Sequence, residues 1–241
     1  MQTQLLKYSN GKKNFIGYLA YDDKRQGPRP GIVVYPEAFG LGEHARSKAN
    51  RLAEAGYVAL AADLHGDGVV HKDLQSVMPA IQALYTDRVA WRSMASAALD
   101  ALLAQPNVDR KRIGAIGFCF GGTTCLEIAR ASPLVGVIST FHAGLNVGLP
   151  EDAGKIRAKV LINHGADDPL VQKDAIDAFM AEMRRDKVDW NMTFYGNTVH
   201  SFTEPAADAR GQLASFRYNK NVDERSWAAM QYLFNEAFGA S

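Results

Sequence analysis

One cysteine of this chain lies between glycines at the end of an apolar run. Residues 113–122 (IGAIGFCFGG) predict a buried strand that ends in a tight turn, and residues 123–130 predict a helix. A Gly-x-Cys-x-Gly turn between a strand and a helix is the setting of a nucleophile elbow, with sulfur where serine is more usual. The helix N-terminus would favour negative charge on the sulfur of Cys119, and the N–H of Phe120 would point at a developing oxyanion. Cys119 is therefore the candidate nucleophile.

Two later strand ends carry the groups that could activate such a nucleophile. Asp167 and Asp168 follow a predicted strand at 160–163, and His200 follows the last predicted strand. The chain order Cys119, Asp168, His200 is the order of the α/β-hydrolase triad. A thiol needs a base within hydrogen-bond reach to ionise at neutral pH, and that base needs a carboxylate to orient its imidazole. These three residues are the predicted triad.

The choice among neighbouring residues is not forced by the sequence. A lone cysteine is more often a buried core residue, and an aspartate before proline commonly begins a turn. His142 and His164 also follow predicted strands. His200 is preferred because it follows the last strand, where the third triad member belongs. Asp168 is preferred over Asp167 because a proline comes directly after it.

Short apolar runs alternate with helical patterns along the whole chain. The expected strands are residues 5–9, 14–21, 31–35, 57–62, 113–118, 135–141, 160–163 and 190–195. The expected helices are residues 44–55, 78–104, 123–130, 171–185 and 222–238. Asn-Gly between the first two strands predicts an antiparallel hairpin. The rest predicts one α/β domain over residues 1–241, with a doubly wound, mostly parallel sheet and helices on both faces. Ligands bind at the carboxyl ends of such strands.

The composition excludes several classes of protein. The chain has 241 residues, 47% of them hydrophobic and 22% charged, which is ordinary for a globular domain. A net charge of +1 gives no basis for nucleic-acid or anionic-membrane binding. The two cysteines make no disulfide framework, and no zinc-ligand spacing is present, so we expect no metal and no cofactor. Without a signal-peptide pattern or a run of ~20 apolar residues, we expect a cytoplasmic protein.

Several segments together resemble the dienelactone hydrolase family, which are α/β-hydrolases with a cysteine nucleophile. The matching segments are 36–40 (PEAFG), 51–58 (RLAEAGYV), 117–122 (GFCFGG), 164–169 (HGADDP) and 199–202 (VHSF), with Tyr218 and 225–227 (RSW) in the tail. They extend over essentially the whole chain. The glycine–cysteine elbow combined with Pro-Glu after the early strand is the specific part, because the aspartate and histidine segments occur across α/β-hydrolases.

The resemblance implies an α/β-hydrolase fold and hydrolysis of a small-molecule ester or lactone through a cysteinyl acyl-enzyme. It implies Cys119 as the nucleophile, His200 as base and then acid, and Asp168 as the residue that orients the histidine. The N–H groups of Phe120 and Ala38 would form the oxyanion hole. We expect a monomer or a homodimer.

The resemblance also implies a role for Glu37, since the matching glutamate of the family contacts the resting thiol and takes part in its activation. A solvated loop carboxylate is the alternative for this residue. Family members that open lactones hold the substrate carboxylate with arginines, one of them four residues after the triad histidine, where this chain has Glu204. Arg88, Arg92, Arg210 and Arg217 are alternatives for that role. The expected substrate contacts are Phe39, Arg88, Arg92 and Phe202.

The missing arginine leaves two other functions open. A general carboxylesterase or thioesterase for neutral acyl groups needs no cationic contact to its substrate. A binding or redox-sensing protein could keep the fold and a reactive thiol without hydrolysis, although such a protein has no need of an acyl-transfer triad.

Overall fold

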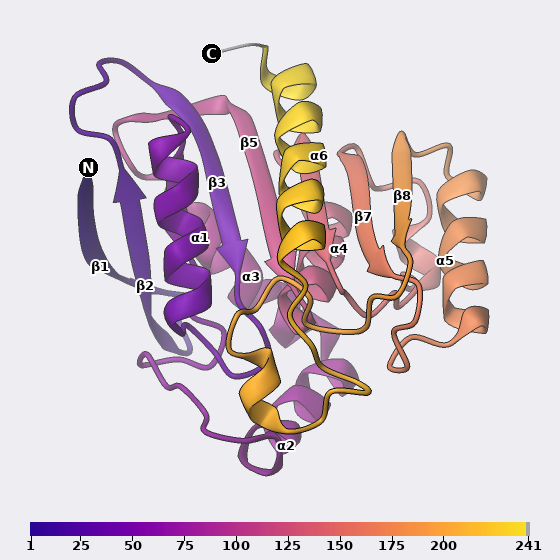
Figure 1. The fold of residues 1–241 in the computed structure, drawn as a ribbon. Coiled ribbons are helices and arrows are strands. Elements are labelled where there is room, and N and C mark those ends of the chain that lie inside the picture. Colours follow the sequence, from indigo (N-terminus) through magenta and orange to yellow (C-terminus); the bar gives the residue numbers. More distant parts are fainter. Residues whose placement is uncertain (240–241) are drawn as a thin grey trace. The chain divides into compact units, whose positions relative to one another are not determined.

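Strands and helices alternate along residues 1–239, which are the part of the chain that the computed structural model describes (Figure 1). The chain divides into two compact units, Met1–Ile116 and Gly117–Ser241. A single domain over residues 1–241 therefore stays a prediction, and the units are described one at a time. Within residues 1–239, none of the helices combines the length and the hydropathy of a bilayer-spanning segment.

The first unit begins with the predicted antiparallel hairpin. Strand β1 (Gln2–Ser9) pairs antiparallel with β2 (Asn14–Tyr21), in a register that sets Tyr8 opposite Phe15. Their rings stack with centroids 5.2 Å apart. Asn10 closes the turn, because its side-chain oxygen accepts the N–H groups of residues 12 and 13. The hairpin prediction is confirmed, and β1 is three residues longer at its start than expected.

The remaining strands of the first unit supply its parallel core. Strand β4 (Val58–Ala61) pairs antiparallel with β2 and parallel with β3 (Arg29–Tyr35), and the order is β1-β2-β4-β3-β5. All seven residues of β3 are buried, as expected of a strand covered on both faces. Figure 1 shows helix α1 (Glu43–Glu54) in front of β3 and helix α3 (Arg88–Leu103) behind it.

The prediction of one long helix over residues 78–104 is wrong, because two helices occupy this stretch. Helix α2 (Leu74–Thr86) ends at Asp87, and α3 begins directly after it. Asp87 leaves the helical conformation (φ −117°, ψ 79°), and its side chain accepts the N–H of Ala90 at 2.9 Å. Aspartate at this position caps the orphan N–H groups of a new helix. The helical periodicity continues through the break and therefore conceals it.

The second unit continues the alternation with parallel strands. Strand β5 (Val108–Phe118) ends at the elbow, and helix α4 (Phe120–Ala131) follows. Strands β6 (Val137–Phe141), β7 (Lys159–Gly165) and β8 (Trp190–Tyr195) pair in parallel, in that order. Helices α5 (Lys173–Arg185) and α6 (Lys220–Phe238) complete the unit, with 3₁₀ turns at Pro150–Asp152 and Ala207–Arg210. The carboxyl ends of these strands share one edge, as the parallel-sheet prediction requires.

A buried arginine ties α4 to α5 in the second unit. The guanidinium of Arg130 binds Glu182 in a bidentate manner, at 3.1 and 2.8 Å, and donates to Glu127 at 2.9 Å. It also donates to the carbonyl of Asn146, in the loop after β6. The side chains of Arg130 and Glu127 are fully buried. Because Arg130 and Glu182 lie 52 positions apart, no local sequence pattern predicts their pairing.

Arg130→Met should destabilise the protein by about 3–5 kcal/mol, because it leaves two carboxylates buried without their cation. Chemical denaturation should show this as a lower midpoint. Arg185→Met is the matched control, since Arg185 pairs only with the neighbouring Asp186 and is largely exposed. That change should cost no more than about 0.5 kcal/mol. Equal effects of the two substitutions would show that the buried cluster contributes nothing beyond surface charge.

Candidate active site

The turn around Cys119 is strained in the way that a nucleophile elbow requires. Cys119 has φ 54° and ψ −119°, outside the regions that residues with side chains favour, and it caps α4. A Cβ atom added at Gly117 would lie 2.0 Å from the carbonyl oxygen of Gly121, and one at Gly122 would lie 2.5 Å from the side chain of Ala143. Only glycine fits at 117 and 122. Cys119 remains partly exposed, whereas Cys125 is fully buried within α4.

The predicted acid and histidine meet at the neighbouring strand ends. Nδ1 of His200 donates to a carboxylate oxygen of Asp168 at 2.7 Å, and both side chains are almost completely buried. The other oxygen of Asp168 accepts the N–H of Leu170 at 2.9 Å, which fixes the carboxylate. Asp167, the alternative acid, is exposed. The structure therefore joins His200 to the aspartate that the sequence favoured.

The ring of His200 has its other nitrogen free for a sulfur partner. Nε2 is buried and accepts or donates no hydrogen bond to a nitrogen or oxygen of residues 1–239. Burial lowers the pKa of His200. The charge of Cys119 and the hydrogen bond to Asp168 raise that pKa by more than burial lowers it, so that it reaches about 10. The imidazolium is therefore the stable form of His200 while the sulfur beside it is a thiolate.

His142, one of the two alternative histidines, bridges the elbow and the loop of His200. Its Nδ1 accepts the N–H of Cys119 at 3.1 Å, and its Nε2 lies 2.8 Å from the hydroxyl of Thr203. The ring is fully buried, with its centroid 5.0 Å from that of His200. Because both ring nitrogens are engaged, His142 has none left to take the thiol proton. Its left-handed backbone (φ 42°) is further strain at this site.

His164, the other alternative, lies inside β7, close to the carboxyl end of that strand. It is buried, and its ring packs edge-on against Phe194. Burial lowers the pKa of His164, the charge of Asp168 raises it, and that of His200 lowers it again. The net lowering keeps His164 neutral at physiological pH, so it adds no charge beside the Asp168–His200 pair.

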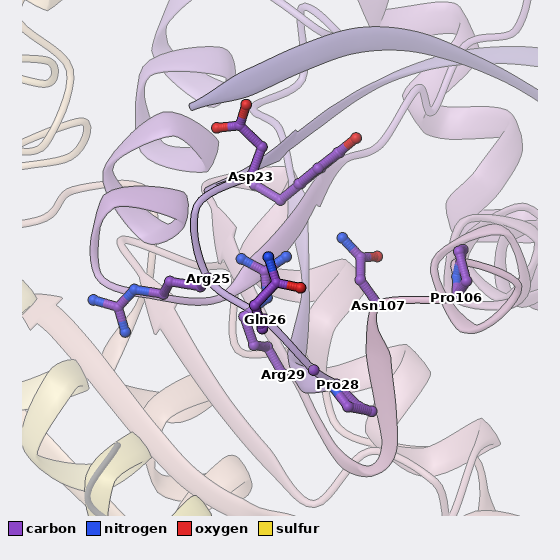
Figure 2. Close-up of a pocket in the computed structure, with 9 residues that line it drawn as sticks. Asp23, Arg25, Gln26, Pro28, Arg29, Pro106 and Asn107 are labelled. Atoms are coloured by element: carbon purple, nitrogen blue, oxygen red, sulfur yellow. The ribbon is translucent and has the colours of Figure 1, made fainter.

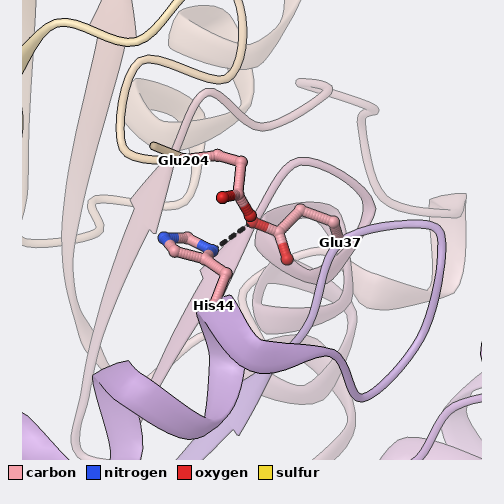
Figure 3. Close-up of side chains that lie close together, drawn as sticks. All are labelled: Glu37, His44 and Glu204. Carbon is pink, nitrogen blue, oxygen red and sulfur yellow. Dashed lines mark ion pairs between the residues drawn. The ribbon is translucent and has the colours of Figure 1, made fainter. Parts of the chain in front are cut away.

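In the first unit, the loop after β3 holds a buried carboxylate. Glu37 is 7% exposed and pairs with Nδ1 of His44, at the start of α1, as Figure 3 shows. The alternative of a solvated loop carboxylate is therefore excluded. The sequence pattern did not identify His44, because it placed that residue at the start of an ordinary helix. Ala38 is buried and Phe39 is partly exposed in the same loop.

The expected substrate contacts have different surroundings. Phe202 is fully buried against the ring of His142, so it supports the site from within and has no surface left for a substrate. Arg88 and Arg92 lie partly buried in the first turns of α3. Arg210 donates to the hydroxyl of Ser201, next to His200, at 3.0 Å. The guanidinium of Arg210 therefore lies beside the residue that follows the triad histidine.

A pocket of about 320 Å³ in the first unit lies at the other end of β3. Figure 2 shows its lining by the loop before β3, including Arg25, by Arg29 at the start of β3, and by Asn107 before β5. This is the amino end of a seven-residue strand whose carboxyl end leads to Glu37, so about 20 Å of strand separates the two ends. Substrates of open α/β sheets bind at carboxyl ends, and this pocket is therefore not the candidate active site.

Comparison with known proteins connects this geometry to one family. The model of the dienelactone hydrolase family matches residues 15–238. A solved structure named m3DLH is 57% identical, with 99% of each chain covered and a TM-score of 0.97. The dienelactone-hydrolase-like promiscuous phosphotriesterase P91, from metagenomic libraries, is 51% identical, with 99% of each chain covered and a TM-score of 0.96. A "Probable 2-oxo-3-(5-oxofuran-2-ylidene)propanoate lactonase" of Bradyrhizobium sp is 27% identical over 78% of this chain and 79% of its own.

Proposed function

Because this chain belongs to the dienelactone hydrolase family, we propose that it hydrolyses an ester or lactone bond of a small molecule through a cysteinyl acyl-enzyme. Cys119 is the nucleophile, His200 moves the proton, and Asp168 orients His200. The observation that carries the proposal is the buried 2.7 Å bond between His200 and Asp168, next to a cysteine in a strained elbow. A structural cysteine needs neither the strain nor the acid–histidine pair.

Acylation begins when the proton of the Cys119 thiol moves to Nε2 of His200. The thiolate attacks the substrate carbonyl carbon, and the carbonyl electron pair moves onto oxygen. The N–H groups of Phe120 and Ala38 stabilise this oxyanion, a pairing that the family relationship supports. When the carbonyl re-forms, the carbon–oxygen bond breaks, and the imidazolium of His200 protonates the departing oxygen. In a lactone, that oxygen stays attached to the acyl group.

Deacylation needs His200 to act as a base, and the acyl-enzyme provides the condition for it. The sulfur of a thioester is uncharged, so the largest influence that raises the pKa of His200 disappears, while burial continues to lower it. The neutral ring can then take a proton from water as the water attacks the thioester. The thiolate leaves, and the carboxylic product forms. Asp168 keeps the correct tautomer throughout, because Nδ1 donates to it.

The substrate class is open between anionic and neutral acyl compounds. Glu204 stands where lactone-opening relatives have an arginine, which favours neutral esters or thioesters, whereas Arg210 beside Ser201 could replace that arginine. A phosphotriester is a second candidate substrate, favoured by the 51% identity to a protein named as a promiscuous phosphotriesterase. Attack of the Cys119 sulfur on phosphorus would expel an aryloxide in the same geometry.

A panel of three substrates tests these alternatives: a neutral aryl ester, a lactone that carries a carboxylate, and an aryl phosphotriester. If Arg210 binds the carboxylate, Arg210→Gln should lower kcat/KM for the lactone at least about tenfold, because a charge-assisted hydrogen bond is lost. The neutral ester should change less than about twofold. Arg217→Gln is the control, since the guanidinium of Arg217 makes only a long bond to the carbonyl of Asn197, and the substitution keeps the backbone N–H that donates to His200.

Equal losses on the neutral and anionic substrates would remove Arg210 from substrate recognition. Turnover of the neutral ester alone would assign the protein to the neutral esterase or thioesterase alternative. Absence of all three reactions, with reversible oxidation of Cys119, would support the redox-sensing alternative.

We also propose that Glu37 restrains the resting thiol, as the matching glutamate does in the family. A carboxylate close to a thiol disfavours the thiolate by like-charge repulsion and can accept its proton. Glu37→Gln should therefore speed the alkylation of Cys119 by iodoacetamide at neutral pH, and it should lower kcat/KM because a proton acceptor is lost. Glu43→Gln is the control, since Glu43 is exposed in the first turn of α1. Unchanged alkylation and turnover in Glu37→Gln would limit Glu37 to its pairing with His44.

The cytoplasmic location and the monomeric or homodimeric state stay expectations. The proposed reaction needs only water and the side chains named above, so neither a metal nor a cofactor enters it.

A further inference from the structure

The loop that follows β3 is held through its carbonyl groups. The N–H of Gly40 donates to the carbonyl of Glu37 at 3.1 Å and closes a tight turn. The N–H of His71 donates to the carbonyl of Phe39 at 2.9 Å, which ties this turn to the loop after β4. Gly40 has φ 103°, and a Cβ atom there would lie 2.7 Å from the carbonyl oxygen of Val69. The two loops therefore fit together in one arrangement.

The carbonyl between these two belongs to Ala38, and a histidine side chain holds it. Nε2 of His65 lies 2.6 Å from the carbonyl oxygen of Ala38, and both residues are buried. A carbonyl oxygen only accepts, so Nε2 must carry the hydrogen. The N–H of Ala38 donates to no residue of the first unit. A buried backbone donor without a partner is rare, which points to a ligand atom as its acceptor.

His65 is itself fixed by an aspartate at the end of β4. Asp63 is fully buried, and its carboxylate accepts four backbone N–H groups. The donors are His65 at 2.9 Å and Gly66 at 2.8 Å on one oxygen, and Ile16 at 3.0 Å and Gly68 at 2.8 Å on the other. These bonds set the backbone from which the His65 side chain projects toward Ala38.

The charge state of His65 suits this bond. Burial lowers the pKa of His65, and the neighbouring charges of His71 and Lys13 lower it further, against the Ala38 carbonyl and Asp63, which raise it. The ring of His71 lies against it, with centroids 4.6 Å apart. At neutral pH the ring is therefore neutral, and its one proton must lie on Nε2 to satisfy Ala38.

We propose that His65 is a positioning residue of the oxyanion hole, which it aims by holding the carbonyl of Ala38. The N–H of Ala38 shares a peptide plane with the carbonyl of Glu37, which the N–H of Gly40 holds, and the carbonyl of Ala38 lies on the next plane, which His65 holds. With both planes held, the direction of the donor is fixed. This inference rests on the proposed function, in which the Ala38 N–H binds the oxyanion. An oxyanion-hole donor is effective only when it is aimed at the charge before the reaction begins.

The test compares His65→Met, which has no donor, with His65→Gln, whose amide reaches to a similar distance. His65→Met should lower kcat for a neutral aryl ester by about 10- to 100-fold, and weaken binding of an aryl trifluoromethyl ketone by a similar factor, because both reactions form an oxyanion. KM should change less than about threefold. His65→Gln should recover a large part of kcat. His71→Gln, which keeps its backbone N–H, is the control.

Alkylation of Cys119 by iodoacetamide separates positioning from general damage. This displacement forms no oxyanion at an acyl carbon, so its rate should stay within about twofold of the wild-type rate in every variant. If His65→Met does not fold, His65→Asn takes its place, because its amide is one methylene too short to reach Ala38.

Wild-type kcat without the His65 donor would overturn the inference, as would a glutamine variant no better than the methionine or asparagine one. Alkylation that falls in step with kcat would do the same. These outcomes differ from a failure of the proposed function, which would be seen in the wild-type protein as no hydrolysis, or as hydrolysis that survives Cys119→Ala.

Discussion

Cys119→Ala should lose ester hydrolysis by at least about 10⁴-fold while the protein remains folded. Removal of a single nucleophile from an acyl-transfer triad abolishes covalent catalysis and leaves only the contribution of substrate binding and the oxyanion hole. The fold should persist, because alanine removes little volume from the elbow. The turn is set by glycines on both sides and by the hydrogen bonds of the Cys119 backbone. Measured kcat/KM and a thermal melt together check both parts.

Cys125→Ala is the matched control for this prediction. Cys125 is fully buried in α4, and burial raises its pKa well above that of an ordinary thiol, which makes it unreactive. Its replacement should cost some stability and leave hydrolysis largely intact. Cys119→Ser should fold and be impaired, since a hydroxyl ionises less readily than a thiol. Wild-type hydrolysis in Cys119→Ala would refute the proposed mechanism.

His200→Ala and Asp168→Asn should each reduce kcat/KM by about 10³–10⁴-fold, and the double variant should be little worse than His200→Ala alone. The non-additivity follows from the structure, because Asp168 acts only through its 2.7 Å bond to His200. Asp167→Asn is the control, since Asp167 is exposed and one position away. Additive losses would show that the two residues act separately, and a severe loss in Asp167→Asn would identify a different acid.

The dependence of stability and activity on pH is a second test of the His200–Asp168 pair. The pKa of His200 is raised to about 10, so this histidine holds its proton more tightly in the folded protein than a free histidine does. The stabilisation from this proton is fully present below about pH 6.5 and declines until it is lost near pH 10. The last step of acylation, in which the imidazolium protonates the departing oxygen, should likewise slow on the alkaline side. Asp168→Asn removes a charge that supports the imidazolium, so the alkaline limb should move to lower pH.

Much of the fold follows from local sequence patterns. The Asn-Gly turn predicts the hairpin, and short apolar runs predict the buried parallel strands, because both depend on residues close together in the chain. The family match and the structural relatives confirm the α/β-hydrolase fold. The break at Asp87 was missed, since apolar residues keep the helical period across it and only the aspartate cap signals the new helix.

The site could be predicted only in part, because its contacts join distant residues. Three histidines follow strands, and periodicity cannot tell that His200 bonds to Asp168 while His142 binds the backbone of Cys119. His65 was overlooked, although it follows the end of β4 more closely than His200 follows the end of β8. The burial of Phe202 also depends on packing, which no local signal reveals.

The most direct test of the account is to trap the acyl-enzyme. The wild-type protein is mixed with an activated aryl ester and quenched in acid within one turnover, and the intact mass and peptide map are measured. We predict one acyl group per chain, on the sulfur of Cys119, formed at least as fast as the steady-state turnover and released by hydroxylamine, as a thioester is. Turnover with Cys119 unmodified, or an acyl group on another residue, would contradict the cysteinyl mechanism.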